Sequence, residues 1–196
     1  MPSDARQKMI QSAVTLLATR GLDGTAFSDV LAHSGAPRGS IYHHFPDGKD
    51  QLVDAAVALA GERALRVLDL VDGAMPEDVT RFFLDLWREV LVRSGLRAGC
   101  AVLAVTVATD SAALLDHAAT VFRAWRARLA ELYVARGVER SVAERFSATL
   151  VAASEGAVVI SRAERSLEPF DLVAAQLRDG TPAGRSSGRR SGRRPT

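Results

Sequence analysis

The chain contains a single cysteine among its 196 residues, so it cannot form an intrachain disulfide bond. It has no run of eighteen apolar residues, and residues 1–9 lack the apolar stretch of a signal peptide. These absences argue against a disulfide-stabilised secreted domain and a membrane-spanning protein, and they predict a chain that works in the reducing cytoplasm. Apolar residues still make up 47% of the sequence, which is enough to bury the core of one large or two small domains.

Groups suited to catalysis are also scarce. The sequence contains no Ser/His/Asp or Cys/His arrangement that indicates a nucleophile, and no phosphate-binding loop. Three of its four histidines lie between residues 33 and 44, and the fourth, His117 beside Asp116, is more typical of a solvated helix face. His43 and His44 are adjacent and would point about 100° apart on a helix, so they cannot hold a metal ion from one face. We therefore predict that the protein is not an enzyme and needs no cofactor and no metal.

Most of the chain has no large excess of positive or negative charge. The formal net charge is +2, but the last segment, 180–196, holds five arginines and no acidic residue, which leaves −3 for residues 1–179. This balance does not favour a general DNA-compacting protein, which would carry a strongly basic body. Because the last segment consists largely of Gly, Ser, Pro and Arg, it is predicted to be disordered, either as a solubilising tail or as an extra, non-specific contact to phosphates.

The most informative segment is residues 26–52, AFSDVLAHSGAPRGSIYHHFPDGKDQL. Its apolar spacing and turn residues predict a helix, a tight turn, a second helix, a loop and a third helix. Gly35 is expected to end the first helix, because glycine tolerates the left-handed conformation of a sharp turn. Pro37 suits the first turn of the second helix, which should run to about Phe45. A short second helix of this kind fits the major groove of DNA.

This second helix has an apolar face and a polar face. Ile41 and Phe45 lie four positions apart and must point to the core. On the other face, Arg38 and Ser40 are candidates for reading base edges, since arginine pairs well with guanine. Tyr42 is better suited to hold a phosphate and so to set the register of the protein on the duplex.

The flanks of the second helix add further candidates. Lys49, at the start of the next helix, is well placed for a phosphate. Thr25 and Ser28 precede or open the first helix, so either hydroxyl is predicted to cap it. Gly39 lets the backbone approach a partner closely. The full set of predicted DNA-binding residues is Thr25, Ser28, Arg38, Gly39, Ser40, Tyr42, His43, His44 and Lys49.

The segment resembles the DNA-binding end of the TetR family of transcriptional regulators. The family pattern of a glycine turn, then a glycine, an aliphatic residue, Tyr, one residue, His and Phe is met by Gly35, Gly39, Ile41, Tyr42, His44 and Phe45. More narrowly, GAPRGSIYHHFPDGK is similar to the subgroup with repressors of lincomycin- and flavonoid-responsive multidrug efflux genes, and GCAVLAVTVA resembles that subgroup's ligand-domain sequence. In one departure, Ala26 and Phe27 stand where many members carry Thr or Ser, which shifts capping and phosphate contact to Thr25 or Ser28.

Helical periodicity continues through the rest of the chain and predicts an all-α fold. We expect a three-helix DNA-binding domain in residues 1–63, with its helix-turn-helix at about 26–45. A helical effector-binding and dimerisation domain should follow in 64–179, ahead of the disordered tail. Composition alone leaves residues 99–108 open to a buried strand, but length and context favour a helix. Including that segment, the helices expected outside the helix-turn-helix cover 4–20, 49–72, 76–93, 99–108, 111–136, 141–165 and 168–178.

The central helices gather much of the small aromatic content, which is seven Phe, two Trp and two Tyr in all. Aromatic residues at helical spacing are more often core than pocket, and that alternative stays open for each of them. The resemblance to the TetR family implies a cavity here for a small effector, and the subgroup suggests a flat aromatic or amphipathic compound. The predicted pocket residues are Phe83, Trp87, Cys100, Phe122 and Trp125.

The last two helices are predicted to form a dimer interface. Ser141 and Glu144 have the spacing of a capping box that starts the first of them. Small residues inside that helix would let two helices approach closely, and two such pairs would assemble as a four-helix bundle. Packing within the chain is the alternative. The predicted interface residues are Ala152, Ala153, Gly156, Ala157, Phe170, Val173 and Leu177.

These features together predict a DNA-binding transcriptional regulator. The expected mechanism is a dimeric repressor that leaves a palindromic operator when a small hydrophobic or aromatic effector binds. The alternative is a non-enzymatic, general DNA-binding protein without an effector. Activation in place of repression also remains open at this point.

Overall fold

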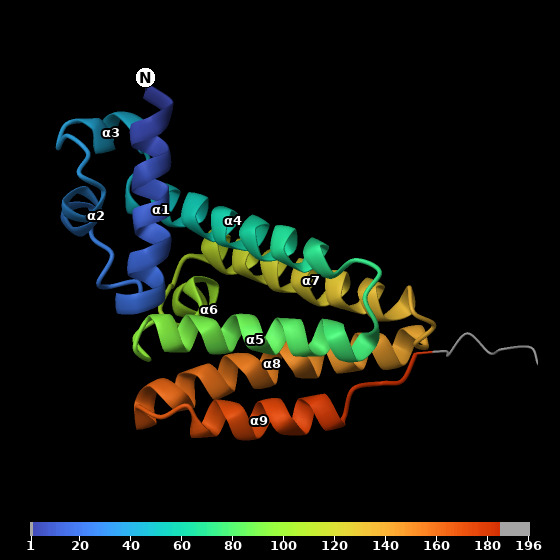
Figure 1. Ribbon diagram of the computed structural model, residues 1–196. Coiled ribbons are helices and arrows are strands. Elements are labelled where there is room, and N and C mark those ends of the chain that lie inside the picture. Colours follow the sequence, from blue (N-terminus) through green and yellow to red (C-terminus); the bar gives the residue numbers. More distant parts are fainter. Residues whose placement is uncertain (1, 185–196) are drawn as a thin grey trace, which may run out of the picture.

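The computed structural model describes residues 2–184, and within this range the chain is entirely helical (Figure 1). It contains nine α-helices and one short 3₁₀ helix, and no strand occurs in the described range. The predicted all-α fold is therefore confirmed. None of the helices between residues 2 and 184 combines the length and the apolar character needed to cross a lipid bilayer.

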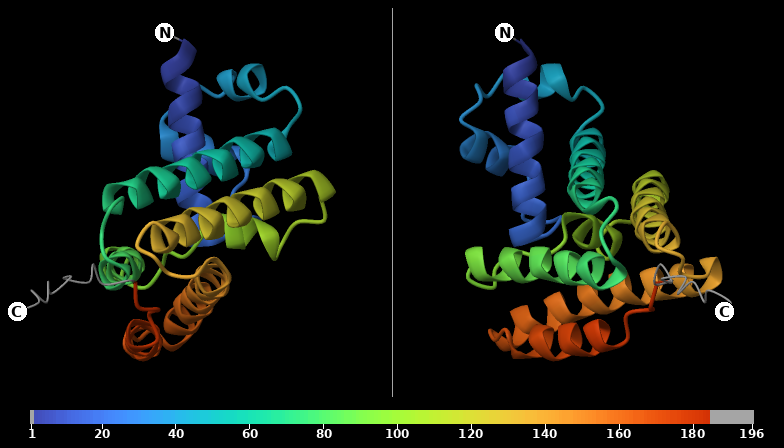
Figure 2. Two further views of the ribbon diagram at one scale, coloured as in Figure 1. Left: turned by 90° about the vertical axis from the view of Figure 1, so that its right-hand side faces the viewer. Right: turned by 45° about the vertical axis from the view of Figure 1, so that its right-hand side comes forward.

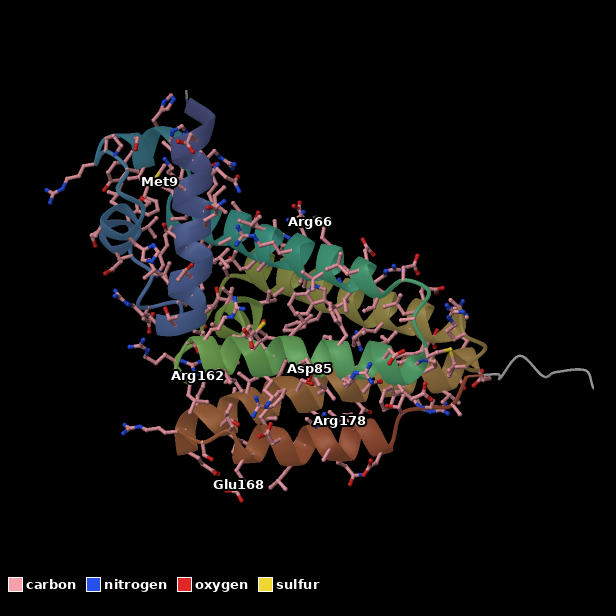
Figure 3. The ribbon with its side chains drawn as sticks, in the orientation of Figure 1. Met9, Arg66, Asp85, Arg162, Glu168 and Arg178 are labelled. Atoms are coloured by element: carbon pink, nitrogen blue, oxygen red, sulfur yellow. The ribbon has the colours of Figure 1, made fainter. Side chains whose placement is uncertain are left out.

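The N-terminal helices are α1 (Pro2–Arg20), α2 (Phe27–Ser34) and α3 (Ser40–His44). Helix α1 stands against both short helices, and Met9, labelled in Figure 3, is fully buried between them. Gly35 ends α2 with φ at +68°, as the sequence predicted. Helix α3 is shorter than predicted. Pro37 lies in a preceding turn, where its carbonyl oxygen accepts the N–H of Ser40 at 3.0 Å.

Helix α4 (Lys49–Leu68) is the longest element of the N-terminal half, and the 3₁₀ helix η1 (Asp69–Val71) extends it. It packs along α1 on one side and along α7 (Ala112–Val134) on the other. At Gly61 the approach to α7 is so close that a Cβ would lie 2.9 Å from a methyl carbon of Val121. The domain boundary predicted between residues 63 and 64 thus falls inside one continuous helix.

The remaining helices are α5 (Pro76–Arg93), α6 (Ala101–Thr106), α8 (Arg140–Glu164) and α9 (Glu168–Asp179). Figure 2 shows α8 and α9 as an antiparallel pair on the side of the molecule far from α2 and α3, with α5 laid against both. Residues 99–108 form the short helix α6, so the helical prediction for this apolar segment is confirmed with narrower bounds.

The predicted capping box of α8 is wrong. The helix begins at Arg140, so the cap position belongs to Glu139, whose carboxylate accepts the backbone N–H groups of Ser141 at 2.9 Å and Val142 at 3.0 Å. An acidic side chain at this place also complements the positive end of the helix dipole. Ser141 is therefore inside the helix, and Glu144 does not reach back to the cap.

The hydrophobic core divides into two clusters that share a seam. One joins α1 to α4 with α6 and the first half of α7, and the other joins α5, α8 and α9 with the second half of α7. Trp87 and Phe122 pack against both clusters. The two clusters do not follow the predicted boundary at residues 63 and 64, because α6 and the first half of α7 pack with α1 to α4 while the second half of α7 packs with α5, α8 and α9.

The predicted tail is described only at its start, because residues 185–196 lie outside the described range. Thr181 departs from the predicted disorder. Its hydroxyl oxygen lies within hydrogen-bond distance, 3.1 Å, of both the Leu177 carbonyl oxygen and the Thr80 hydroxyl, and Thr80 shares a buried hydrogen bond of 2.8 Å with Tyr133. The chain after α9 is therefore held against α5 before the described range ends.

Candidate DNA-reading surface and effector cavity

Helix α3 presents opposite faces to the core and to solvent. Ile41 and Phe45 are fully buried, as their spacing predicted. Tyr42 is 68% exposed, and Arg38, Gly39 and His43 are exposed beside it, while Ser40 and His44 are half-buried. The buried Ile41 and Phe45 side chains anchor one side of this short helix, and this fixes which of its residues face solvent.

The exposed side of α3 is braced by neighbouring groups. The Tyr42 ring packs edge-to-face on Phe27 of α2, with 5.6 Å between ring centroids, which holds the exposed Tyr42 side chain in place. The guanidinium of Arg6 lies 5.4 Å from the centroid of the Phe45 ring and fixes α1 against α3. Ser40 donates its hydroxyl to the Pro37 carbonyl at 2.6 Å, so only its lone pairs remain for a partner.

Lys49 has a structural role that the sequence did not reveal. Its ammonium donates to the carbonyl oxygen of Leu22 at 2.7 Å and ties the start of α4 to the loop after α1. Because an ammonium has three donors, the same group can still bind a phosphate. His33 and Ser12 share a hydrogen bond of 3.0 Å that joins α2 to α1. These contacts tie α2 to α1, and the loop after α1 to the start of α4.

Thr25 and Ser28 differ in exposure. Thr25 is fully buried and donates its hydroxyl to the Gly21 carbonyl at 2.8 Å, so it has no surface to offer to DNA. Ser28 is exposed in the first turn of α2. The cap position belongs to Ala26, which has no side-chain acceptor, and neither hydroxyl caps the helix. The sequence-based cap at Thr25 or Ser28 is therefore wrong, because the helix starts between them.

A cavity of about 310 Å³ lies at the seam between the two core clusters. Four of the five predicted pocket residues line it, namely Phe83, Trp87, Cys100 and Trp125. Phe122 does not line it, and its ring instead packs edge-to-face on Trp125. The side chains that the sequence analysis missed come from α1, α4, α5 and α6, and those with the largest apolar groups are Val14, Val67, Leu68, Leu86, Val90 and Val102.

The cavity is lined by both exposed and buried residues. Arg63 of α4 and Val90 of α5 line it and are exposed, whereas Cys100 and Trp125 are buried. Trp125 donates its indole N–H to the carbonyl oxygen of Gly61 at 3.2 Å, so one wall of the cavity is bonded to α4. Because the walls are largely apolar and aromatic, the cavity suits a compact hydrophobic ligand.

Helices α8 and α9 carry an exposed apolar face, but it differs from the predicted one. Ala157, Phe170 and Leu177 were predicted to lie in the interface, but they are buried in the chain's own core. Ala153 and Val173 are half-buried, and Ala152 and Gly156 are exposed. The exposed apolar side chains that the prediction missed are Val159, Ile160 and Leu172.

Comparison with known proteins agrees with this architecture. The family model described as bacterial regulatory proteins of the tetR family matches residues 9–56, and the model described as transcriptional regulator LmrA/YxaF-like, C-terminal domain, matches residues 76–176. Among its relatives is the uncharacterized HTH-type transcriptional regulator Rv0196 of Mycobacterium tuberculosis, which is 37% identical over 89% of this chain and 92% of its own length. The HTH-type transcriptional regulator LmrA of Bacillus subtilis is 26% identical over 90% of this chain and 96% of its own length.

Solved structures show the same fold. A TetR transcriptional regulator from Chloroflexus aurantiacus is 27% identical and has a TM-score of 0.77, covering 94% of this chain and 98% of its own. The regulatory protein TetR from Rhodobacter sphaeroides has a TM-score of 0.80 at 21% identity, covering 90% of this chain and 98% of its own. The chain is a DNA-binding transcriptional regulator that belongs to the TetR family, with a C-terminal domain of the LmrA/YxaF-like type.

Proposed function

We propose that the protein is a repressor that binds a palindromic operator as a dimer and leaves it when a small hydrophobic or aromatic effector enters the cavity. The observation that carries this proposal is the exposed face of α3, where Arg38 and the braced Tyr42 stand clear of the core. Arg38 would read a base edge in the major groove, and Tyr42 and Lys49 would hold phosphates. Such a regulator must bind chromosomal DNA, so we propose that it acts in the cytoplasm.

The exposed face of α8 and α9 supports a dimer. Val159 and Ile160 are each about half exposed, and Leu172 on α9 is 66% exposed. Ala152 and Gly156 continue the same side of α8, where small side chains permit a close helix contact. A symmetric pair of these faces would form a four-helix bundle and place two α3 helices at a fixed spacing.

Helix α4 is the element through which effector binding would reach the DNA-reading helix. Its first residue, Lys49, is bonded to the loop before α2, while Gly61 accepts the Trp125 indole at the cavity wall. His117 of α7 also contacts Asp54 of α4 at 2.5 Å. A ligand that displaces Trp125 would therefore shift α4, and the shift would favour a dimer whose α3 helices no longer match adjacent grooves.

Selection of bound sequences from a random DNA library with the full-length protein tests the proposal. We expect a palindrome whose two half-sites are separated by about one helical turn or a multiple of it. A library with no enriched sequence, together with binding that fades steeply as salt rises, would support the general DNA-binding alternative and contradict the repressor.

A further inference from the structure

A second hollow, which we call the basic cleft, lies apart from the proposed effector cavity. It has a volume of about 970 Å³, and in the described part of the chain it shares no lining residue with that cavity. The charged residues that line it are all arginines, and no acidic residue of the described range joins them: Arg20, Arg97, Arg162 and Arg165. The cleft therefore concentrates positive charge in a chain whose formal net charge is only +2.

Three separate segments bring these arginines together. Arg20 is the last residue of α1 and pairs with Asp29 of α2 at 3.5 Å. Arg97 lies in the loop between α5 and α6. Arg162 belongs to the last turn of α8, and Arg165 follows as the C-terminal cap of that helix with φ at +53°. The cluster is therefore assembled by the tertiary fold and is not the polar face of a single helix.

The fold uses little of this positive charge. Arg97, Arg162 and Arg165 form no ion pair with any residue between 2 and 184. Arginines near helix C-termini can bond the last carbonyl groups, yet of these three only Arg97 does so, donating to the Ser94 carbonyl at 3.1 Å. The Arg162 guanidinium lies 2.9 Å from where a Cβ on Gly99 would sit. Like charges that share one cleft repel one another, so a bound anion would stabilise the cluster.

The basic cleft lies on the edge of the molecule that carries the helix-turn-helix. The left edge of Figure 1 shows α3 and α2 above the C-terminal ends of α1, α5 and α8. The views in Figure 2 also place the ends of α5 and α8 below α2. Arg162, labelled in Figure 3, lies between α5 and α8 at this edge. The cleft is therefore situated between the DNA-reading helices and the outward face of α8 and α9.

The proposed dimer would place two basic clefts beside each other. Val159 lines the cleft and also belongs to the exposed apolar face of α8 and α9. A two-fold axis through that face would bring the partner's cleft next to this one, with one α3 helix on each side of the pair. The paired clefts would then face the stretch of duplex between the two half-sites, where neither α3 reads a base.

We propose that the basic cleft binds phosphates of the operator backbone between the two half-sites. The inference rests on the proposed dimeric repressor and adds a DNA contact outside the helix-turn-helix. Guanidinium groups bind phosphate oxygens through paired N–H donors, and exposed Arg97 and Arg165 have donors to offer. Because phosphate contacts carry no sequence information, the cleft raises affinity and leaves the base preference of α3 unchanged.

The double variant Arg97→Gln/Arg165→Gln removes two exposed charges from the cleft. Fluorescence anisotropy with the selected palindrome, over a range of salt concentrations, compares it with wild type. We expect at least about tenfold weaker binding near physiological salt. The slope of log affinity against log salt should be smaller by about 2, since each dimer loses at least two phosphate contacts. An unchanged slope would overturn the proposal.

The matched control for the double variant is Arg123→Gln/Arg126→Gln. It removes the same charge from two exposed arginines of α7 that do not line the basic cleft. Both the affinity and its salt dependence should stay those of wild type. A control that weakened binding as much as Arg97→Gln/Arg165→Gln would assign the effect to net charge and contradict a contact at the cleft.

Uncharged methylphosphonate groups in place of the phosphates between the half-sites test where the contact lies. Wild type should bind this duplex more weakly than the unmodified palindrome. Arg97→Gln/Arg165→Gln should lose much less, because its contact is already absent. Arg162→Gln, tested alone, should also lose less than wild type, and it decides if the double variant fails to fold. Equal losses in wild type and variants would place the phosphate contact elsewhere and overturn the proposal.

The outcomes separate this inference from the proposed function. A palindrome that wild type and the double variant bind equally at every salt concentration overturns only the contact at the cleft. Failure to recover any palindrome overturns both. Calorimetry with inorganic pyrophosphate tests the other source of phosphate: binding that the double variant loses, with DNA binding unchanged, would assign the cleft to a small anion and overturn its role on DNA.

Discussion

The side chains around α3 differ in whether the fold already uses their polar groups. Thr25, Ser40 and Lys49 each donate a hydrogen bond to a backbone carbonyl, so part of their capacity supports the structure. Arg38 is exposed and takes part in no ion pair among the described residues. The free guanidinium can therefore adopt the bidentate geometry that reads a guanine, which makes Arg38 the expected source of base preference.

Replacing Arg38 with alanine should lower the affinity for the selected operator by about 1–3 kcal/mol, because one base-reading contact is lost. Affinity for unrelated DNA should change much less, since phosphate contacts remain. Fluorescence anisotropy with operator and scrambled duplexes measures both values. Arg126→Ala, which removes an exposed arginine of α7 far from α3, is the control and should change neither. An equal loss on both duplexes would assign Arg38 to a phosphate.

The raised pKa of Glu155 also predicts how stability depends on pH. Burial moves this pKa from its ordinary value of 4.5 to about 7, so the folded state binds the proton more tightly than the unfolded state does. The resulting stabilisation is complete below pH 4.5 and is lost as pH rises through about 7, a change of about 3 kcal/mol. Glu155→Gln lacks this proton and should lack this loss.

Urea unfolding of wild type and Glu155→Gln at one protein concentration, across this pH range, measures the difference. The variant should gain stability relative to wild type as pH rises, because only wild type then buries a charge. Glu164→Gln, which changes an exposed carboxylate on the same helix, should run parallel to wild type. A difference between Glu155→Gln and wild type that does not vary with pH would mean that Glu155 has an ordinary pKa.

At the scale of elements, helical periodicity predicted which segments are helices but not where they begin. Helix α3 was predicted from Pro37, yet residues 37–40 form a turn, with Arg38 and Gly39 at its centre, that the sequence pattern does not distinguish from a first helical turn. The cap of α8 was assigned to Ser141, although Glu139 lies close enough to accept two N–H groups. Capping depends on side-chain reach after folding, and several polar residues near a helix start fit the same pattern.

Gly61 sets the distance between α4 and α7. A Cβ there would lie 2.9 Å and 3.0 Å from the two methyl carbons of Val121, which is closer than van der Waals contact permits. Gly61→Ala should therefore lower the free energy of unfolding by on the order of 1 kcal/mol, even though alanine favours the helix. Thermal unfolding measures the change. Adding Val121→Ala should relieve the contact, so that the double variant loses less than the sum of the two single changes.

At the scale of the whole molecule, the proposed effector cavity lies where the two core clusters meet. Four of its lining residues were predicted from their aromatic or sulfur-bearing side chains, but its small and aliphatic walls from α1 and α4 were not. The face of α8 was predicted less well, because small residues occur on both its inner and outer sides. Ala157 is buried and Gly156 is exposed, and only the packing of α5, α7 and α9 around α8 decides between them.

The proposed dimer would depend on the outward face of α8 and α9, so Leu172→Glu on α9 should convert the protein to a monomer. Leu172 is 66% exposed within the chain, so a charge there leaves the fold intact but cannot be buried against a partner. Analytical ultracentrifugation would show the change in mass. Affinity for the palindrome should fall to that of a half-site, because each monomer then binds one half alone.

The matched control for this change is Leu70→Glu in η1, since Leu70 is 75% exposed and lies outside α8 and α9. This variant should remain dimeric and bind the palindrome as wild type does. If both variants stayed dimeric, the exposed face of α8 and α9 would not be the interface, and the spacing of the two α3 helices would have to come from another surface. If only Leu172→Glu became monomeric yet still bound the palindrome fully, the reading of two half-sites would not require this dimer.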